Sequence, residues 1–197
     1  MEITHKHINK TLNYNGSQIE KSWAFKSFGI KGSSIISWIG PMNISPEHLK
    51  DFEDISLEIK SDNMIHFIVE HFDIQPANLR IAYMRQRLLV MILKEELAKN
   101  GIDSIRKGDD IYISNSDDLN KLTVSIATVS ISSMKIHLGI NITSDGTPDD
   151  VDTIGLFELA NNIFNSDNLM DLINNLVRNY INELNDIELD MSKTKVL

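Results

Sequence analysis

The sequence predicts an α+β fold in which helices flank one mostly antiparallel sheet. Three observations predict it: a long helical pattern over residues 76–100, four β-rich runs between 102 and 142, and two amphipathic helical patterns over 149–162 and 166–184. Because short polar segments separate the four β-rich runs, their simplest arrangement is an antiparallel meander. We expect a single domain over residues 1–186, followed by a flexible tail over 187–197.

The first third of the chain predicts short elements. Residues 1–8 alternate weakly and indicate a strand, and residues 18–28 favour a short helix. Residues 34–39 are β-branched and aromatic and end at Gly40-Pro41, which is typical of a strand closed by a turn. Ser45-Pro46-Glu47 has the order of residues that opens a helix, so a brief helix is expected there, followed by a strand over 64–72.

The clearest single element is the long helix over 76–100. Its apolar residues recur at helical spacing, and Gly101 stands directly after it as a stop signal. The β-rich runs that follow cover 102–106, 110–114, 121–129 and 134–142, with 115–120 expected as a hairpin loop. Asp or Ser precedes each of the two C-terminal helical patterns and is able to cap it.

Composition excludes several classes of function. A 197-residue chain with 42% hydrophobic and 24% charged residues is able to form a packed core. Its net charge of −9 argues against broad binding to nucleic acid or to anionic membranes. Without Cys it has no disulfide, thiolate metal site or thiol nucleophile. The N-terminus lacks the apolar stretch of a signal peptide and no run is long enough to span a membrane, so we expect a cytoplasmic protein.

Most of the candidate chemistry lies between residues 105 and 141. A hairpin that brings Asp110 close to Lys121 would place an ammonium group beside carboxylates, an arrangement that can hold Mg²⁺ and a phosphate together. The same residue types also fit a solvated turn with a cross-strand ion pair. Residue types alone favour the solvated turn.

The order of motifs in this region resembles that of the biotin and lipoate protein ligases. Their Asn-Asp turn, lysine-containing strand and Gly-Ile-Gly-x-Asn-Val strand have counterparts in Arg106–Ile111, Lys121–Ser125 and Leu138–Ile142. The whole chain is similar to an archaeal family known as domain of unknown function 366, through the motifs MIHFIVEHF, RKGDDIYIS, KLTVSIATVSISSMKIHLGIN and VDTIGLFEL. That family is placed with the class II aminoacyl-tRNA synthetase and biotin synthetase fold.

The resemblance implies roles for particular residues. It implies that Lys121 contacts the acyl carboxylate and the α-phosphate of an adenylate. It also implies that Asp109 and Asp110 help to hold Mg²⁺ or the nucleotide, and that the cofactors are Mg²⁺ and ATP. The other implied ligand-binding residues are His66, Arg106, Ser125, His137, Gly139 and Asn141.

Each histidine also has a structural interpretation, as a strand or core residue bonded to one partner. His71 lies five residues after His66, so the two should point to opposite faces of a strand and not form a metal pair. In the predicted helix, Arg80 and Arg87 share a face and offer phosphate contacts, although such arginines are more often solvated.

The sequence also departs from the ligases at the points that hold their ligand. It lacks their Gly-Arg-Gly-Arg loop and their Arg-Arg-x-x-Gly-Gly stretch, Asp109 replaces the Asn of Asn-Asp, and Val124 replaces a glycine beside the ligand.

Two functions follow from these observations. One is Mg²⁺-dependent handling of ATP or an acyl-adenylate, and the other is a non-catalytic module that binds a small metabolite or a partner. ATP-independent acyl transfer through a thiol ranks last because the chain has no Cys, and the sequence leaves open whether a homodimer forms.

Overall fold

The centre of the molecule is a five-stranded sheet with the order β1-β2-β3-β8-β7. The computed structural model describes residues 2–195 except 54, 56, 116, 117, 160 and 161. Strand β1 runs parallel to β2, and the other neighbouring pairs in this sheet are antiparallel, which confirms the mostly antiparallel prediction. The strands are β1 (Thr4–Ile8), β2 (Ser34–Asn43), β3 (Lys60–His71), β7 (Thr123–Val129) and β8 (Met134–Asn141).

A smaller sheet of three antiparallel strands stands beside it, built from β4 (Ile105–Lys107), β5 (Asp110–Asn115) and β6 (Asp118–Lys121). The prediction of one continuous meander was therefore wrong. All eight residues of β8 are buried, and such a strand needs a neighbour on each side, which β3 and β7 supply. Residues 118–120, predicted as part of the hairpin loop, pair with β5 together with Lys121, and residues 116 and 117 lie outside the described residues.

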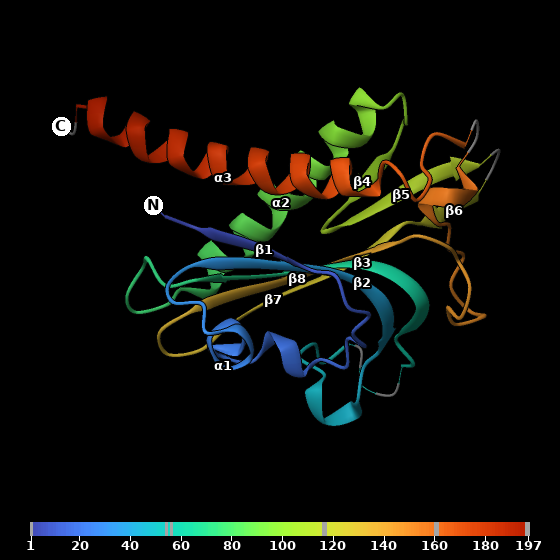
Figure 1. Cartoon of the computed structure of the whole chain (residues 1–197), viewed down its shortest axis with the longest axis horizontal. Coiled ribbons are helices and arrows are strands. Elements are labelled where there is room, and N and C mark those ends of the chain that lie inside the picture. Colours follow the sequence, from blue (N-terminus) through green and yellow to red (C-terminus); the bar gives the residue numbers. More distant parts are fainter. Residues whose placement is uncertain (1, 54, 56, 116–117, 160–161, 196–197) are drawn as a thin grey trace.

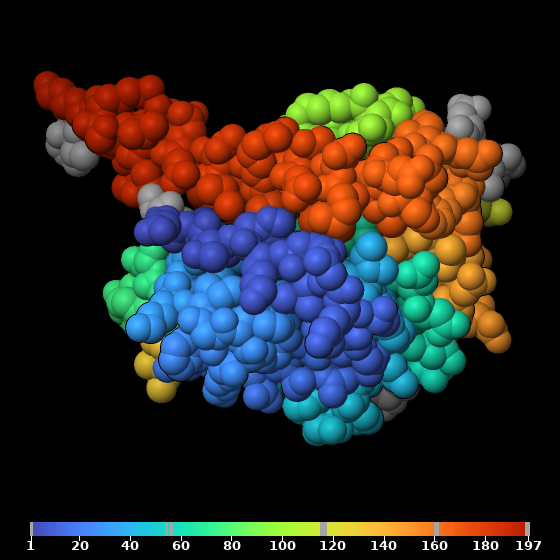
Figure 2. Space-filling model, viewed as in Figure 1, coloured from blue at the N-terminus to red at the C-terminus, as the bar shows by residue number. Residues whose placement is uncertain are grey.

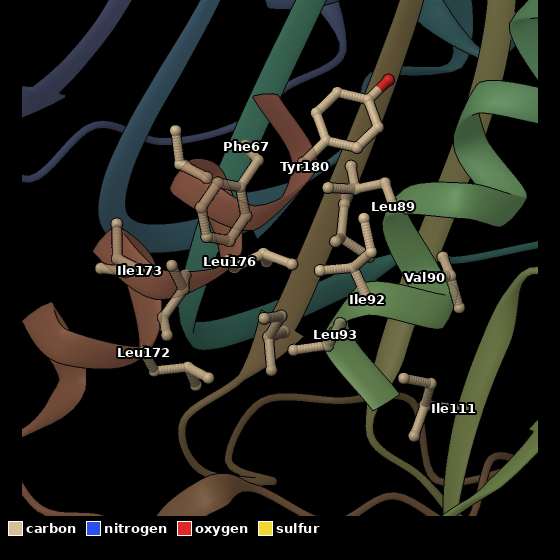
Figure 3. Packing of buried hydrophobic residues seen from close by; sticks show 14 of the residues in the cluster. Phe67, Leu89, Val90, Ile92, Leu93, Ile111, Leu172, Ile173, Leu176 and Tyr180 are labelled. Atoms are coloured by element: carbon tan, nitrogen blue, oxygen red, sulfur yellow. The ribbon is translucent and has the colours of Figure 1, made fainter. Parts of the chain in front are cut away.

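Two long helices, α2 (Leu79–Lys99) and α3 (Leu169–Lys193), cover one face of the larger sheet (Figure 1). The side chain of Asn78 caps α2 by accepting from the backbone N–H of Ile81 at 3.1 Å, and Gly101 follows the helix at a φ of +77°. Side chains from both helices interdigitate above β3 (Figure 3), and this is the main hydrophobic core. The residues labelled in that view are Phe67, Leu89, Val90, Ile92, Leu93, Ile111, Leu172, Ile173, Leu176 and Tyr180.

The N-terminal segment covers the opposite face of the sheet, where it forms η1 (Ser17–Ile19) and α1 (Trp23–Phe28) (Figure 1). The predicted helix over 18–28 is interrupted at Ser22, which has a φ of 62°. Its backbone N–H donates to the Glu70 carboxylate at 2.9 and 3.1 Å, and this tertiary contact replaces a helical hydrogen bond. The brief helix expected after Ser45 is η2 (Pro46–His48).

The predicted helix over 149–162 was wrong. The described part of this segment holds no α-helix: besides Asn162, its helical residues are those of the 3-10 turn η3 (Leu156–Glu158), and the backbone at Asp152 and Ile154 bonds to Lys121 instead. Helix α3 continues past the expected end at Leu184 to Lys193, and its last turns extend away from the body of the molecule (Figure 2). None of the described helices has both the length and the apolar composition that a membrane crossing requires.

Candidate functional site

A cleft of about 350 Å³ opens beside β7 and β8, on the face that the N-terminal segment covers. Two loops form its sides, one joining β2 to β3 and the other following β8. Charged groups and apolar side chains both line it, as expected for a small-molecule site. The lining residues are Tyr14, Met42, Ile44, His48–Asp51, Glu53, Leu57–Lys60, Asp109, Asp110, Lys121, Val124–Ile126, His137, Asn141, Thr147, Pro148, Asp150, Val151 and Thr153.

Lys121 and Asp110 form an ion pair at the charged end of this cleft. The Lys121 Nζ lies 2.8 Å from Asp110 Oδ2, so the hairpin brings the two together as predicted. The backbone of Lys121 is held on both sides, donating to the Asp152 carbonyl at 2.8 Å and accepting from Ile154 N–H at 3.1 Å. The Asn141 amide also donates to the Lys121 carbonyl, at 3.4 Å. The ammonium group is therefore carried on a rigid strand end.

Burial and charge pull the Asp110 carboxyl in opposite directions. Burial raises the pKa of Asp110, and the neighbouring Lys121 opposes that change. Burial works against the charged form of Lys121, but Asp110 outweighs it and raises the pKa of Lys121. The Asp110 Oδ1 atom is buried and has no hydrogen-bond partner among the described residues. A buried ion pair with a perturbed carboxyl pKa and an unpartnered oxygen in a cleft is typical of functional sites.

Removing the Lys121 charge is expected to raise the pKa of Asp110 further, because burial and Asp109 would then act with less opposition. We expect a Lys121→Met variant to show this in an NMR pH titration of ¹³C-labelled Asp carboxyl groups. Lys107→Met is the matched control, since the Lys107 ammonium lies over the Tyr112 ring at 5.5 Å. An unchanged or lowered Asp110 pKa in Lys121→Met would contradict the arrangement.

Asp109 is anchored by residues of α2 and β7. Its Oδ2 accepts from Gln86 Nε2 at 2.8 Å, and the same amide nitrogen donates to Ser125 Oγ at 2.8 Å. Its Oδ1 lies 2.9 Å from Arg87 Nη1, an ion pair that lacks good hydrogen-bond geometry. Both carboxylate oxygens of Asp109 are therefore occupied by side chains of the protein.

The three arginines of α2 lie in different surroundings. Arg87 meets Asp109 at the edge of the cleft, as its predicted position on the helix allows. Arg85 forms a two-pronged contact with Asp73 at 2.8 and 2.6 Å, away from the cleft. Arg80 is exposed. None of the three lines the cleft, so a phosphate contact from α2 would require Arg87 to leave Asp109.

Aromatic rings close the floor of the cleft. Tyr14 stacks on His137 with ring centroids 3.7 Å apart and planes inclined by 14°. His137 Nε2 lies 3.1 Å from His66 Nδ1, and His66 stacks on Trp38. On the other face of β3, His71 bonds to the Tyr180 hydroxyl at 3.0 Å, which confirms that the two β3 histidines face apart.

Six of the nine residues predicted for the site line the cleft: Asp109, Asp110, Lys121, Ser125, His137 and Asn141. Arg106 does not, because its guanidinium group binds the Gly108 carbonyl on the exposed edge of the small sheet. Gly139 and His66 are not lining residues, although the His66 ring contacts His137 in the floor. A methyl group at Gly139 would come within 2.9 Å of Met64 Cε and 3.1 Å of Val124 Cγ2, so the glycine leaves room for the packing there.

Sequence reasoning missed Tyr14 and Gln86. Tyr14 reaches the cleft because its backbone pairs with Met42 of β2, a contact between distant segments that no local motif announces. Gln86 lies between two arginines in α2 and is fully buried. The sequence could have indicated it, because an uncharged polar residue on the core side of a helix needs a hydrogen-bond partner.

The carboxylates predicted as metal ligands, Asp109 and Asp110, already have protein partners. No group of three or more His, Cys, Asp or Glu side chains among them is arranged to hold a metal ion. Asp109 is already bound by Arg87 and Gln86, and one Asp110 oxygen is bound by Lys121. Mg²⁺ usually keeps several waters and binds through one or two carboxylates together with substrate phosphates, so Asp109 and Asp110 as Mg²⁺ ligands stay a prediction.

A family model of the Domain of unknown function (DUF366) matches residues 3–195. The chain belongs to the DUF366 family. The DUF366 protein is 41% identical over 193 residues to the uncharacterized protein MJ0805 of Methanocaldococcus jannaschii, covering 95% of this chain and 82% of that one. A solved structure of a protein of unknown function from Pyrococcus horikoshi is 35% identical, with a TM-score of 0.88 and complete coverage of both chains.

More distant structures share the fold of this DUF366 protein. Protein Ta0514 of T. acidophilum, with bound lipoic acid, has a TM-score of 0.62 at 13% identity, covering 94% of this chain and 87% of that one. The biotin acetyl coenzyme A carboxylase synthetase of Helicobacter pylori, with bound biotinylated ATP, has a TM-score of 0.54 at 15% identity, covering 92% and 75%. The predicted class II synthetase-like fold of the biotin and lipoate protein ligases is thereby confirmed.

Proposed function

We propose that the cleft binds a small carboxylic acid or its adenylate, with Lys121 facing the carboxylate or phosphate oxygens. The observation behind this proposal is the Lys121 ammonium, fixed at 2.8 Å from Asp110 on a strand end that lines the cleft. The fold supports it, because solved structures with this fold hold lipoic acid and biotinylated ATP. A cytoplasmic location, where ATP is available, is part of the same proposal.

The chemistry of the site follows from its charges. When a carboxylate attacks an α-phosphate, negative charge increases on the non-bridging oxygens. A fixed ammonium group stabilises that charge more than it stabilises the bound substrate. In this cleft Asp110 keeps Lys121 protonated and oriented, and the apolar side chains of Val124 and Ile126 would contact the hydrocarbon part of the ligand.

The binding of adenylate analogues tests the proposal. We expect octanoyl- or lipoyl-sulfamoyl adenosine to raise the melting temperature, because a ligand that binds only the native state stabilises it. Lys121→Ala should weaken binding by at least ~10-fold in calorimetry, as expected for losing a hydrogen bond to a charged group. Lys107→Ala, on the same small sheet but outside the cleft, should bind like the unmodified protein. Unchanged affinity in Lys121→Ala would refute the role of Lys121.

A second candidate function is a non-catalytic module for an uncharged or zwitterionic metabolite. Three cationic side chains at or beside the cleft already have acidic partners: Arg87 with Asp109, Lys121 with Asp110, and Lys60 with Glu58 at 2.9 Å. Val124, which lines the cleft, also stands where the ligases that the sequence resembles have a glycine. If no adenylate analogue binds at millimolar concentration, this second function becomes the better interpretation.

A further inference from the structure

The floor of the cleft contains two histidine rings whose proton positions are set by their surroundings. His66 Nε2 lies 3.1 Å from the Gly40 carbonyl oxygen, and a carbonyl oxygen only accepts. His66 must therefore carry a proton on Nε2. Burial lowers the pKa of His66 to about 4, so near neutral pH the ring is uncharged and its Nδ1 has a lone pair.

That lone pair determines the state of the second ring. His137 Nε2 lies 3.1 Å from His66 Nδ1, so His137 must donate its Nε2 proton to this acceptor. Burial holds the pKa of His137 well below its usual range, and the ring is therefore also neutral. A neutral histidine has one proton, so His137 Nδ1 is left as an acceptor.

Nothing in the described protein satisfies this acceptor. No described residue donates to His137 Nδ1. This nitrogen is not fully buried, so it can still be reached from the cleft. His137 lines the cleft, and its neighbours on β7 there are apolar: Ile126 pairs with His137, and Val124 pairs with Gly139. The face of the Tyr14 ring covers His137. The floor thus offers one hydrogen-bond acceptor within an apolar frame.

We propose that His137 is a specificity-determining residue, whose Nδ1 accepts a hydrogen bond from an N–H or O–H group on the ligand. The proposal rests on the function assigned to the cleft above and names the class of ligand that it takes. A ligand ending in a plain hydrocarbon would strip water from Nδ1 without replacing the bond. Sites built around a buried polar group therefore bind such analogues more weakly than ligands that supply the hydrogen bond.

Two matched pairs of probes test this selectivity. We expect 8-hydroxyoctanoyl-sulfamoyl adenosine to bind at least ~10-fold more tightly than the octanoyl analogue, which corresponds to about 1.4 kcal/mol. In His137→Phe, which keeps a ring beneath Tyr14, the two should bind equally. For the small probes, 2-pyrrolidone should shift the ¹⁵N signal of His137 Nδ1, whereas cyclopentanone, of similar size but without an N–H, should not.

The proton positions are measured directly on the unmodified protein by ¹⁵N NMR of labelled histidines. We expect His66 and His137 to carry their protons on Nε2. A proton on His137 Nδ1, or equal responses to 2-pyrrolidone and cyclopentanone, would overturn the proposal. These measurements need no adenylate, so failure of the adenylate function and failure of the His137 assignment give different results.

Discussion

Acidification from pH 6.5 to 5 is expected to lower the free energy of unfolding by several kcal/mol. His66, His71 and His137 are almost fully buried, and burial lowers the pKa of His66 to about 4, that of His71 to about 3, and that of His137 well below its usual range. In the unfolded chain the same side chains bind protons near pH 6.5. Below that pH the unfolded state binds more protons, so stability falls as the pH decreases.

The differences between the folded and unfolded pKa values of the three histidines define the pH range and the slope of this loss of stability. The loss begins near pH 6.5 and continues towards pH 4, with a ceiling of about 4 kcal/mol per pH unit when three groups contribute fully. Urea unfolding followed by circular dichroism at pH 7, 6 and 5 measures it. A His71→Gln variant, which keeps a polar partner for Tyr180, should show a slope smaller by about one third. Equal stability of the unmodified protein at pH 7 and 5 would contradict the burial of these rings.

Gly40→Ala is expected to destabilise the protein by about 3 kcal/mol, near the upper end for inserting a methyl group into a packed interior. A methyl group at Gly40 would lie 2.1 Å from the Leu12 carbonyl oxygen, which is backbone and cannot turn aside. The same carbonyl accepts from Trp38 Nε1 at 2.9 Å, and the Gly40 carbonyl is the partner of His66. The substitution therefore displaces both the N-terminal segment and the cleft floor.

Gly139→Ala is the matched control for this prediction. Its added methyl group would meet the end of the Met64 side chain at 2.9 Å, and a flexible thioether is able to move. We expect a cost of about 1 kcal/mol, so thermal denaturation should show a much larger loss for Gly40→Ala. Equal losses of thermal stability in the two variants would contradict this prediction, because they would mean that the backbone around Leu12 moves aside at little cost.

The elements that the sequence predicted well were those with a strong local pattern. Helix α2 has regular apolar spacing, a capping Asn78 and a stop at Gly101, and its predicted bounds were close to the observed ones. Gly40-Pro41 was expected to end a strand, but β2 continues to Asn43 with an irregularity between Gly40 and Met42. Tertiary pairing with Tyr14 overrides the local turn signal at that point.

In the candidate site, too, the sequence predicted local contacts and missed those between distant segments. Asp110 and Lys121 are carried by one hairpin, so short-range reasoning was enough to bring them together. The contact between His66 and His137 requires β3 to lie beside β8, and Tyr14 comes from a third region of the chain. Strand order is decided by burial across the whole sheet, which no motif of a few residues encodes.

The pairing of β3 with β8 has a consequence for how the chain folds. His71 pairs with Met134, and all of α2 and the small sheet lie between them in the sequence. Closing so long a loop is entropically costly, and such non-local pairings slow folding. A chain with its hairpins and helices formed but these two strands still apart has no His66–His137 contact and no cleft floor. The cleft floor therefore depends on the pairing of two strands that are far apart in the sequence, and it exists only in a chain whose larger sheet is closed.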